Sequence, residues 1–168
     1  NYFMSLELFD ICIADGAGKS ALHHACSQPA NDTVLFLMKH DSPIDQPDGL
    51  GYTALMYAIA NGNFNVAKWL CQRGASLFTK SASGNSALHI ACSLGNLLLA
   101  KWLAESGLQA DEENDDSLTP LEYAVFKGHT DVVAFLTGIR GGGGSASSPA
   151  VLTNDLQKEL VEVDIFCQ

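Results

Sequence analysis

A repeat of 33 residues constrains this chain more than any other feature. Similar nine-residue segments, GKSALHHAC, GYTALMYAI, GNSALHIAC and SLTPLEYAV, begin at residues 18, 51, 84 and 117, so each start lies 33 residues after the one before it. Two further columns recur in the same phase, a glycine and an aromatic residue followed by leucine. Their members are Gly62, Gly95, Gly128, and Phe36, Trp69, Trp102, Phe135. Columns in register predict a stack of similar units, each of which buries its apolar faces against its neighbours.

Each column has a physical reason. A Ser or Thr in the third position of each segment can cap the helix that follows by accepting a hydrogen bond from a free amide. Pro120 then lies in a first helical turn, where a missing N–H costs nothing. The glycine column permits a left-handed turn between two helices. A small alanine lets neighbouring helix pairs approach closely. The alanines are Ala25, Ala58, Ala91 and Ala124.

The period and the pattern Gly-x-Thr-(Pro/Ala)-Leu-His-x-Ala resemble the ankyrin repeat, from about Leu6 to Arg140. The resemblance implies an all-α solenoid of four repeats, near 16–48, 49–81, 82–114 and 115–140, within one domain at 1–140. Leu6 to Asp15 is predicted to form one helix of a truncated earlier unit, so we expect a piece of a longer array. The terminal repeats are atypical, with Pro29 for the inter-helix glycine, Ser117 for the first glycine and Glu122 for the histidine.

Composition excludes several classes of function. The 168 residues carry a net charge of −10, and the nine Lys and Arg are scattered, so the sequence predicts no binding to nucleic acid. No apolar run approaches the roughly 20 residues that span a bilayer, which predicts no membrane insertion. The five cysteines show no metal-ligand spacing. Cys26 and Cys92 are predicted to be buried thiols, and we expect a monomer in the cytoplasm, with the nucleus also compatible.

The sequence predicts no enzyme, cofactor or metal site. Catalysis would require a nucleophile held beside a base, and no segment suggests a pocket for such a pair. The resemblance implies that His23 and His89 form hydrogen bonds between adjacent repeats. The acidic run 111–116 is interpreted as a solvated loop, with a cation or a basic partner as the alternative.

Residues 141–148, GGGGSASS, are predicted to be an engineered flexible linker, because a glycine run closed by serine is typical of a designed fusion. Residues 149–168 match no repeat column and are interpreted as a fused partner peptide. Leucines every four residues place one apolar face on a short helix, whereas 161–166 alternates like an extended peptide. Both conformations stay open. The predicted peptide anchors are Leu152, Leu156, Leu160, Ile165 and Phe166.

The resemblance implies that proteins bind the concave face, which is formed by the β-turn fingers and the first helices. The sequence therefore predicts a scaffold or adaptor fragment that binds a short apolar–acidic motif, here residues 149–168 in cis. The alternative is that this segment caps the C-terminal end of the array and that the true ligand is absent. The predicted groove residues are His24, Tyr52, Tyr57, Asn61, Asn85, Ile90, Leu94, Leu118, Tyr123, Phe126 and Lys127.

Overall fold

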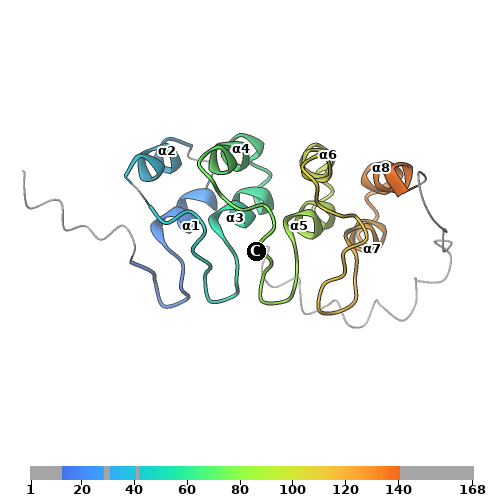
Figure 1. Cartoon of the computed structure of the whole chain (residues 1–168), viewed down its shortest axis with the longest axis horizontal. Helices are drawn as coiled ribbons and strands as arrows, with labels where there is room; N and C mark the ends of the chain where they lie inside the picture. The colour runs from blue at the N-terminus through green and yellow to red at the C-terminus, as the bar shows by residue number, and fades with distance from the viewer. Residues whose placement is uncertain (1–12, 29–30, 41, 141–168) are drawn as a thin grey trace, which may run out of the picture.

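The computed structural model describes residues 13–28, 31–40 and 42–140, and this part of the chain is helical without a named strand. Its helices form two layers, with the loops that we call fingers below the first helices (Figure 1). We call each finger with its two helices a repeat, and the fingers are 14–20, 47–53, 80–86 and 113–119. The helix pairs are α1 (Ala21–Cys26) and α2 (Asn31–Lys39), α3 (Ala54–Ala60) and α4 (Phe64–Gln72), α5 (Ala87–Ser93) and α6 (Leu97–Glu105), and α7 (Pro120–Phe126) and α8 (Thr130–Arg140).

The first helix of each repeat begins where the capping column predicted. Thr53 and Thr119 accept hydrogen bonds from the amides of the third helical residues, at 3.4 and 3.3 Å, and Ser20 and Ser86 occupy the same N-cap position. The second helices of the middle repeats have caps that were not predicted from the sequence. Asn63 and Asn96 accept from the amides of Val66 and Leu99, at 3.3 and 3.1 Å. Caps are needed because these helices are too short to hold themselves.

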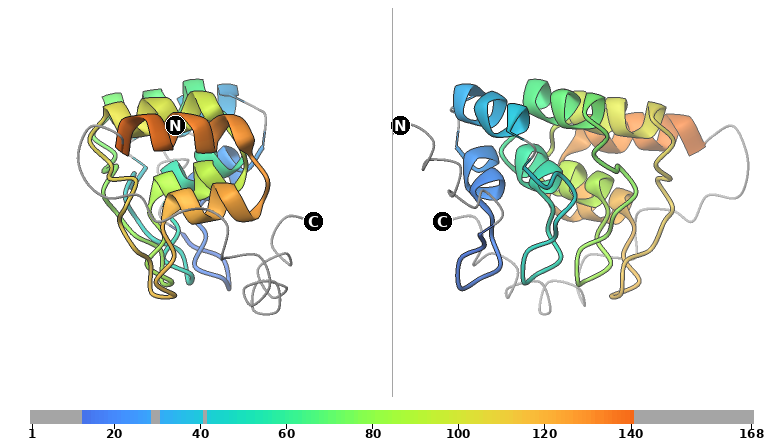
Figure 2. Two further views of the ribbon diagram at one scale, coloured as in Figure 1. Left: turned by 90° about the vertical axis from the view of Figure 1, so that its right-hand side faces the viewer. Right: turned by 60° about the vertical axis from the view of Figure 1, so that its left-hand side comes forward.

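The core lies between successive helix pairs, which stack along the row seen end-on in Figure 2. The leucine in the fifth position of the repeated segment is fully buried at Leu22 and Leu88, as is Leu103 on α6, and Ala58, Ala91 and Ala124 are fully buried where first helices meet. Cys26 and Cys92 are buried as predicted, and burial raises the pKa of each thiol to about 12. Trp69 and Trp102 are only half-buried, so these side chains cover the edge of the core and do not fill it.

Glycines make the turns inside each repeat. The predicted left-handed turns between helices are confirmed, because Gly62, Gly95 and Gly128 have φ of 68°, 68° and 77°. A second use of glycine lies in the fingers. Gly51 has φ of 75°, and a Cβ added there would lie 2.5 Å from the amide nitrogen of Ala82 in the next finger. That close approach allows the Ala82 amide to donate to the Leu50 carbonyl at 2.8 Å.

The predicted N-terminal helix is wrong at its end. Ile13, Ala14 and Asp15 are not helical, and Ala14 pairs with Ser20 in an isolated bridge at the base of the first finger. The cause is the finger turn, in which the Gly18 amide donates to the Asp15 carbonyl at 2.9 Å. The rest of that predicted helix, the predicted linker at 141–148 and the predicted peptide at 149–168 lie outside the described residues.

The close packing of the fingers predicts that alanine substitutions at two left-handed glycines reduce the free energy of unfolding by different amounts. Gly74 has φ of 96° and nothing within 4 Å of an added Cβ, so Gly74→Ala costs only the backbone strain, about 1 kcal/mol. Gly51→Ala adds a clash with a backbone amide, and we expect a loss of about 3 kcal/mol or more. Urea unfolding followed by circular dichroism measures both. Equal losses would show that the fingers do not depend on their close packing.

Candidate protein-interaction face

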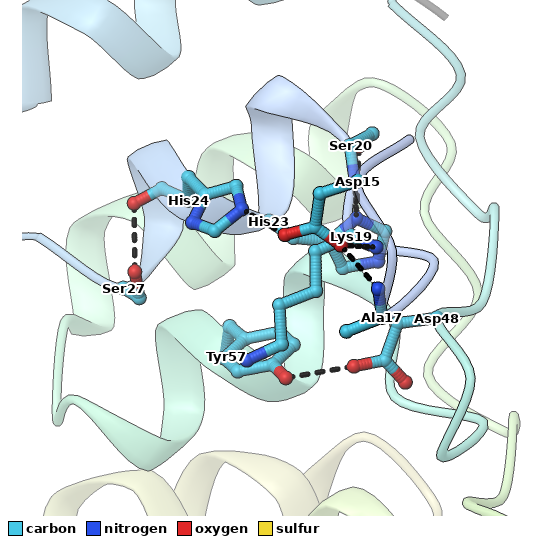
Figure 3. A network of polar contacts seen from close by, with 9 residues as sticks. All are labelled: Asp15, Ala17, Lys19, Ser20, His23, His24, Ser27, Asp48 and Tyr57. Carbon is cyan, nitrogen blue, oxygen red and sulfur yellow. Dashed lines mark hydrogen bonds and ion pairs between the residues drawn. The ribbon is translucent and has the colours of Figure 1, made fainter. Parts of the chain in front are cut away.

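A column of side-chain acceptors organises the fingers. Asp48 accepts from the amides of Leu50 and Tyr52 through Oδ1, at 2.9 and 2.8 Å. Asp15 repeats this arrangement in the first finger, where its Oδ1 accepts from the amides of Ala17 and Lys19 at 2.8 and 2.9 Å (Figure 3). The Lys19 amide foremost, and then His24, hold the pKa of Asp15 below its ordinary value. Each acceptor therefore fixes the turn of its own finger.

The same side chains tie three of the fingers to their first helices. The Tyr57 hydroxyl donates to Oδ2 of Asp48 at 2.7 Å, and Nε2 of His24 lies 2.8 Å from Oδ2 of Asp15 (Figure 3). In the fourth repeat, Nδ2 of Asn114 donates to the Tyr123 hydroxyl at 3.1 Å. The helix partner stands nine residues after the acceptor in each case, which makes the two positions a matched pair.

The third finger has the acceptor without the tie. The single hydroxyl oxygen of Ser81 accepts from the amides of Ser83 and Asn85, at 3.3 and 3.2 Å. The residue nine positions later is the apolar Ile90, which is buried. This acceptor column was not predicted from the sequence. Its signal was present, since Asp15, Asp48, Ser81 and Asn114 are spaced by 33 residues and stand three residues before the finger glycine or Ser117.

Two residues of the predicted groove are not available to a partner. Ile90 is 8% exposed and Tyr123 is 7% exposed, so the prediction that these two side chains belong to the groove surface is wrong. The reason is their position nine residues after the finger acceptor, in a column that faces the finger of the same repeat and that we call the brace column. Tyr57 is half-buried in that column, and its ring meets His23 edge-on at 5.7 Å. Burial, and next the bond to Asp48, raise the pKa of Tyr57.

The remaining predicted residues lie at the surface on fingers or at the ends of first helices. Leu94 is 38% exposed at the end of α5. Leu50, which was not predicted as a groove residue, is 41% exposed at the tip of the second finger. Asn61 is exposed, but its Nδ2 donates to the Tyr57 carbonyl at 2.9 Å. His24 and Lys127 are also exposed, and the half-buried members of the set are Tyr52, Asn85, Leu118 and Phe126.

A lysine lies over an aromatic ring at the N-terminal end of this surface. Nζ of Lys19 lies 4.9 Å from the centre of the Tyr57 ring, within cation–π distance (Figure 3). The Tyr52 ring is 5.8 Å from the same ring. His24 lies beside them but is already engaged with Asp15. At the other end, Nζ of Lys127 lies 6.0 Å from the Phe126 ring. We call this set of exposed and half-buried residues the finger-side surface. Its members are Lys19, His24, Leu50, Tyr52, Tyr57, Asn61, Asn85, Leu94, Leu118, Phe126 and Lys127.

Buried histidines connect successive repeats, as the resemblance implied. Nδ1 of His23 accepts from the Ser20 amide at 2.9 Å, so the proton must lie on Nε2, which donates to the Tyr52 carbonyl at 3.0 Å. His89 repeats this arrangement between the Ser86 amide and the Leu118 carbonyl, at 3.1 and 3.0 Å. Burial lowers the pKa of both histidines. Their role is structural, since both ring nitrogens are engaged.

The acidic run has structural members. Asn114 is buried, and Oε1 of Glu112 lies 2.8 Å from Nζ of Lys80 in the preceding finger. Among the described residues, no cluster of three or more His, Cys, Asp or Glu side chains has the geometry to hold a metal ion. No helix in the described part is both long and apolar enough to cross a membrane.

Comparison with known families agrees with the geometry. A family model described as ankyrin repeats (three copies) matches residues 2–81 and 74–142, which together cover most of the chain. A comparison with curated proteins returned no match.

The two histidines predict that stability depends on pH. Their pKa values are lowered in the folded protein and lie near 6.5 in the unfolded chain. As pH falls below about 6.5, the unfolded state therefore binds protons first and the free energy of unfolding decreases. We expect a loss on the order of 1 kcal/mol between pH 7.5 and 5.5 in urea titrations.

The control is the double variant His23→Met/His89→Met, because Met56 naturally fills this column in the second repeat. It should be less stable at pH 7.5, by about 1–2 kcal/mol per lost pair of bonds. It should also lose most of the pH dependence. A wild-type slope retained by the double variant would assign the effect to other groups.

Proposed function

We propose that the finger-side surface of this chain, which belongs to the ankyrin-repeat family, binds a short apolar–acidic segment of protein. Members of that family are generally protein–protein interaction modules. We propose residues 149–168 as that segment, tethered in cis through 141–148. The observation that carries the proposal is a set of exposed or half-buried apolar side chains, Leu50 on a finger and Leu94 and Phe126 at the ends of first helices, beside fingers that are held in place by their own backbone. In this role the chain is a scaffold or adaptor that catalyses no reaction.

The distribution of residue types supports this function. The column that follows the first helices reads Gln28, Asn61, Leu94 and Lys127, and the column one residue earlier includes Phe126. Leu94 and Phe126 therefore lie in neighbouring repeats with polar residues on either side. An apolar centre with a polar rim is the usual anatomy of a protein interface, and aromatic residues supply much of its affinity.

The rigidity of the fingers supports it further. The amides of Gly49, Ala82 and Asp115 each donate to a carbonyl of the preceding finger, at 2.8, 2.8 and 3.2 Å. Fingers that are ordered before binding lose little entropy when a partner docks. Pre-organisation of this kind raises affinity without adding a contact.

Charge and tethering favour the cis segment as the ligand. Its acids Glu159, Glu162 and Asp164 complement Lys19 at the N-terminal end of the surface, although exposed pairs contribute little individually. The eight linker residues span roughly 15–17 Å as a random coil and raise the local concentration of the segment to around the millimolar range. A weak ligand would be held at that concentration.

A second candidate role for the segment rests on the C-terminal end of the array. Leu121, Val125 and Val133 are half-buried, whereas the same columns are fully buried at Leu88, Cys92 and Ala100. Residues 149–168 would cover this apolar face as a capping helix. The segment would then stabilise the array, and the finger-side surface would be left for another partner.

The two roles predict that different variants release the segment. Leu94→Ala or Phe126→Ala should speed amide hydrogen exchange within 149–168 by about tenfold, since truncating an apolar anchor costs 1–2 kcal/mol. Leu98→Ala is the control, because Leu98 is 59% exposed on α6, away from the fingers. Tyr57→Ala is a poor choice, because it also removes the brace to Asp48. Mass spectrometry of the full chain measures the exchange.

The outcome separates the candidates. Release by Leu94→Ala and Phe126→Ala, with Val125→Ala silent, supports binding at the finger-side surface. Release by Val125→Ala alone identifies a cap. Exchange in 149–168 at the rate of an unstructured peptide in the wild-type chain would reject both roles and leave the surface for a partner in trans.

A further inference from the structure

We infer that the array is closed at its fourth repeat: no further ankyrin repeat, whether from this chain or from a second copy, can stack in register on α7 and α8. Three positions carry this inference, residues 117, 122 and 140. At each of them the fourth repeat differs from all three earlier repeats, in a finger residue, in a residue of the first helix and in the length of the second helix.

The first position lies in the finger turn. A Cβ added to Gly18, Gly51 or Gly84 would lie 2.7, 2.5 or 2.8 Å from a backbone nitrogen of the following finger. The fourth finger has Ser117 in this column, in the same left-handed conformation with φ of 58°. Its Cβ therefore occupies the space in which the amide of a fifth finger would have to lie. Distances under 3.0 Å essentially never occur for a real Cβ.

The second position lies on the helix face that meets the next finger. His23 and His89 donate through Nε2 to carbonyls of the following fingers. Glu122 stands in this column, and its Oε2 accepts from the Thr119 amide at 2.7 Å, the bond that Nδ1 accepts in the histidines. A carboxylate oxygen can only accept, so it would repel the carbonyl of a fifth finger. Met56 lacks the donor as well, but its side chain is neutral.

The third position lies where the chain leaves the second helix. α4 and α6 end at Gln72 and Glu105, and Gly74 and Gly107 then turn with φ of 96° and 100° toward the next finger. α8 runs two residues further in the same register, because Ile139 and Arg140 are still helical. Arg140 is therefore still helical at the position where Gly74 and Gly107 have a positive φ.

These three differences give the finger-side surface a fixed length. A partner reads four fingers, and the end of the array rejects a fifth whatever its origin. An open head-to-tail contact between identical stacks would extend into filaments, because nothing in its geometry closes it. Closure at the fourth repeat removes that contact and fits a module that binds a partner without polymerising.

The test inserts an identical repeat at two places. A copy of residues 75–107 enters the full chain in phase after Gly107 or after Arg140, since both residues belong to the same column. Ser83→Thr in the copy distinguishes its peptides by mass. The measurement is hydrogen exchange in the copied finger, at the amide that corresponds to Ala82. In the internal insertion we expect exchange slowed by about 100-fold or more, and in the terminal insertion exchange within about threefold of an unstructured peptide.

Protection of the terminal copy equal to that of the internal copy would overturn the inference. A second chain, with Ser117→Gly, Glu122→His and Arg140→Gly added to the terminal insertion, tests its cause. Protection restored to within about tenfold of the internal copy supports the three positions as the block. A terminal copy that stays unprotected in that chain, beside a protected internal copy, would show that these positions are not what closes the array.

Discussion

The contact on which the rest of this structure depends is the backbone hydrogen bond between adjacent fingers. The Ala82 amide reaches the Leu50 carbonyl at 2.8 Å only because Gly51 has no Cβ and adopts a positive φ. The stacked fingers then fix the spacing at which the first helices meet, and that spacing requires the fully buried alanine column. Burial of the leucines follows from it, so one short contact relates the glycine, alanine and leucine columns to each other.

The repeating columns made the helical fold predictable, because the residues of each column make the same interaction in several repeats. The Ser and Thr caps, the left-handed glycines and the inter-repeat bonds of His23 and His89 all follow from the period and the resemblance. The prediction of a helix up to Asp15 was wrong, because apolar spacing suggested a helix where the Asp15 side chain makes a finger turn. A local acceptor outweighed the hydrophobic pattern there.

The surface was predicted less well than the core, and the reason is geometric. Periodicity shows which positions are equivalent, but it does not show how far a side chain at one position reaches. Tyr57, Ile90 and Tyr123 share a column, yet Tyr57 is half-buried while the other two are buried. Leu50 was overlooked because apolar residues at a turn are easily dismissed, although the finger holds it at the tip. Exposure depends on three-dimensional neighbours that a single column cannot reveal.

The matched pairs explain how such a surface can change its partner without losing its fold. Two of the pairs join polar atoms of a finger and its helix, Asp48 with Tyr57 and Asn114 with Tyr123. In the third repeat, Ser81 stands opposite the apolar Ile90, which has no polar side-chain atom that needs a partner. A lone replacement of Ile90 by tyrosine would bring a hydroxyl into a buried site where Ser81, whose one oxygen already accepts two hydrogen bonds, offers no further acceptor, which is costly. The brace positions must therefore change in pairs. The finger acceptors place no such restriction on positions such as Gln28, Asn61 and Leu94. Partner specificity can therefore vary at these positions while the residues that form the stack stay the same.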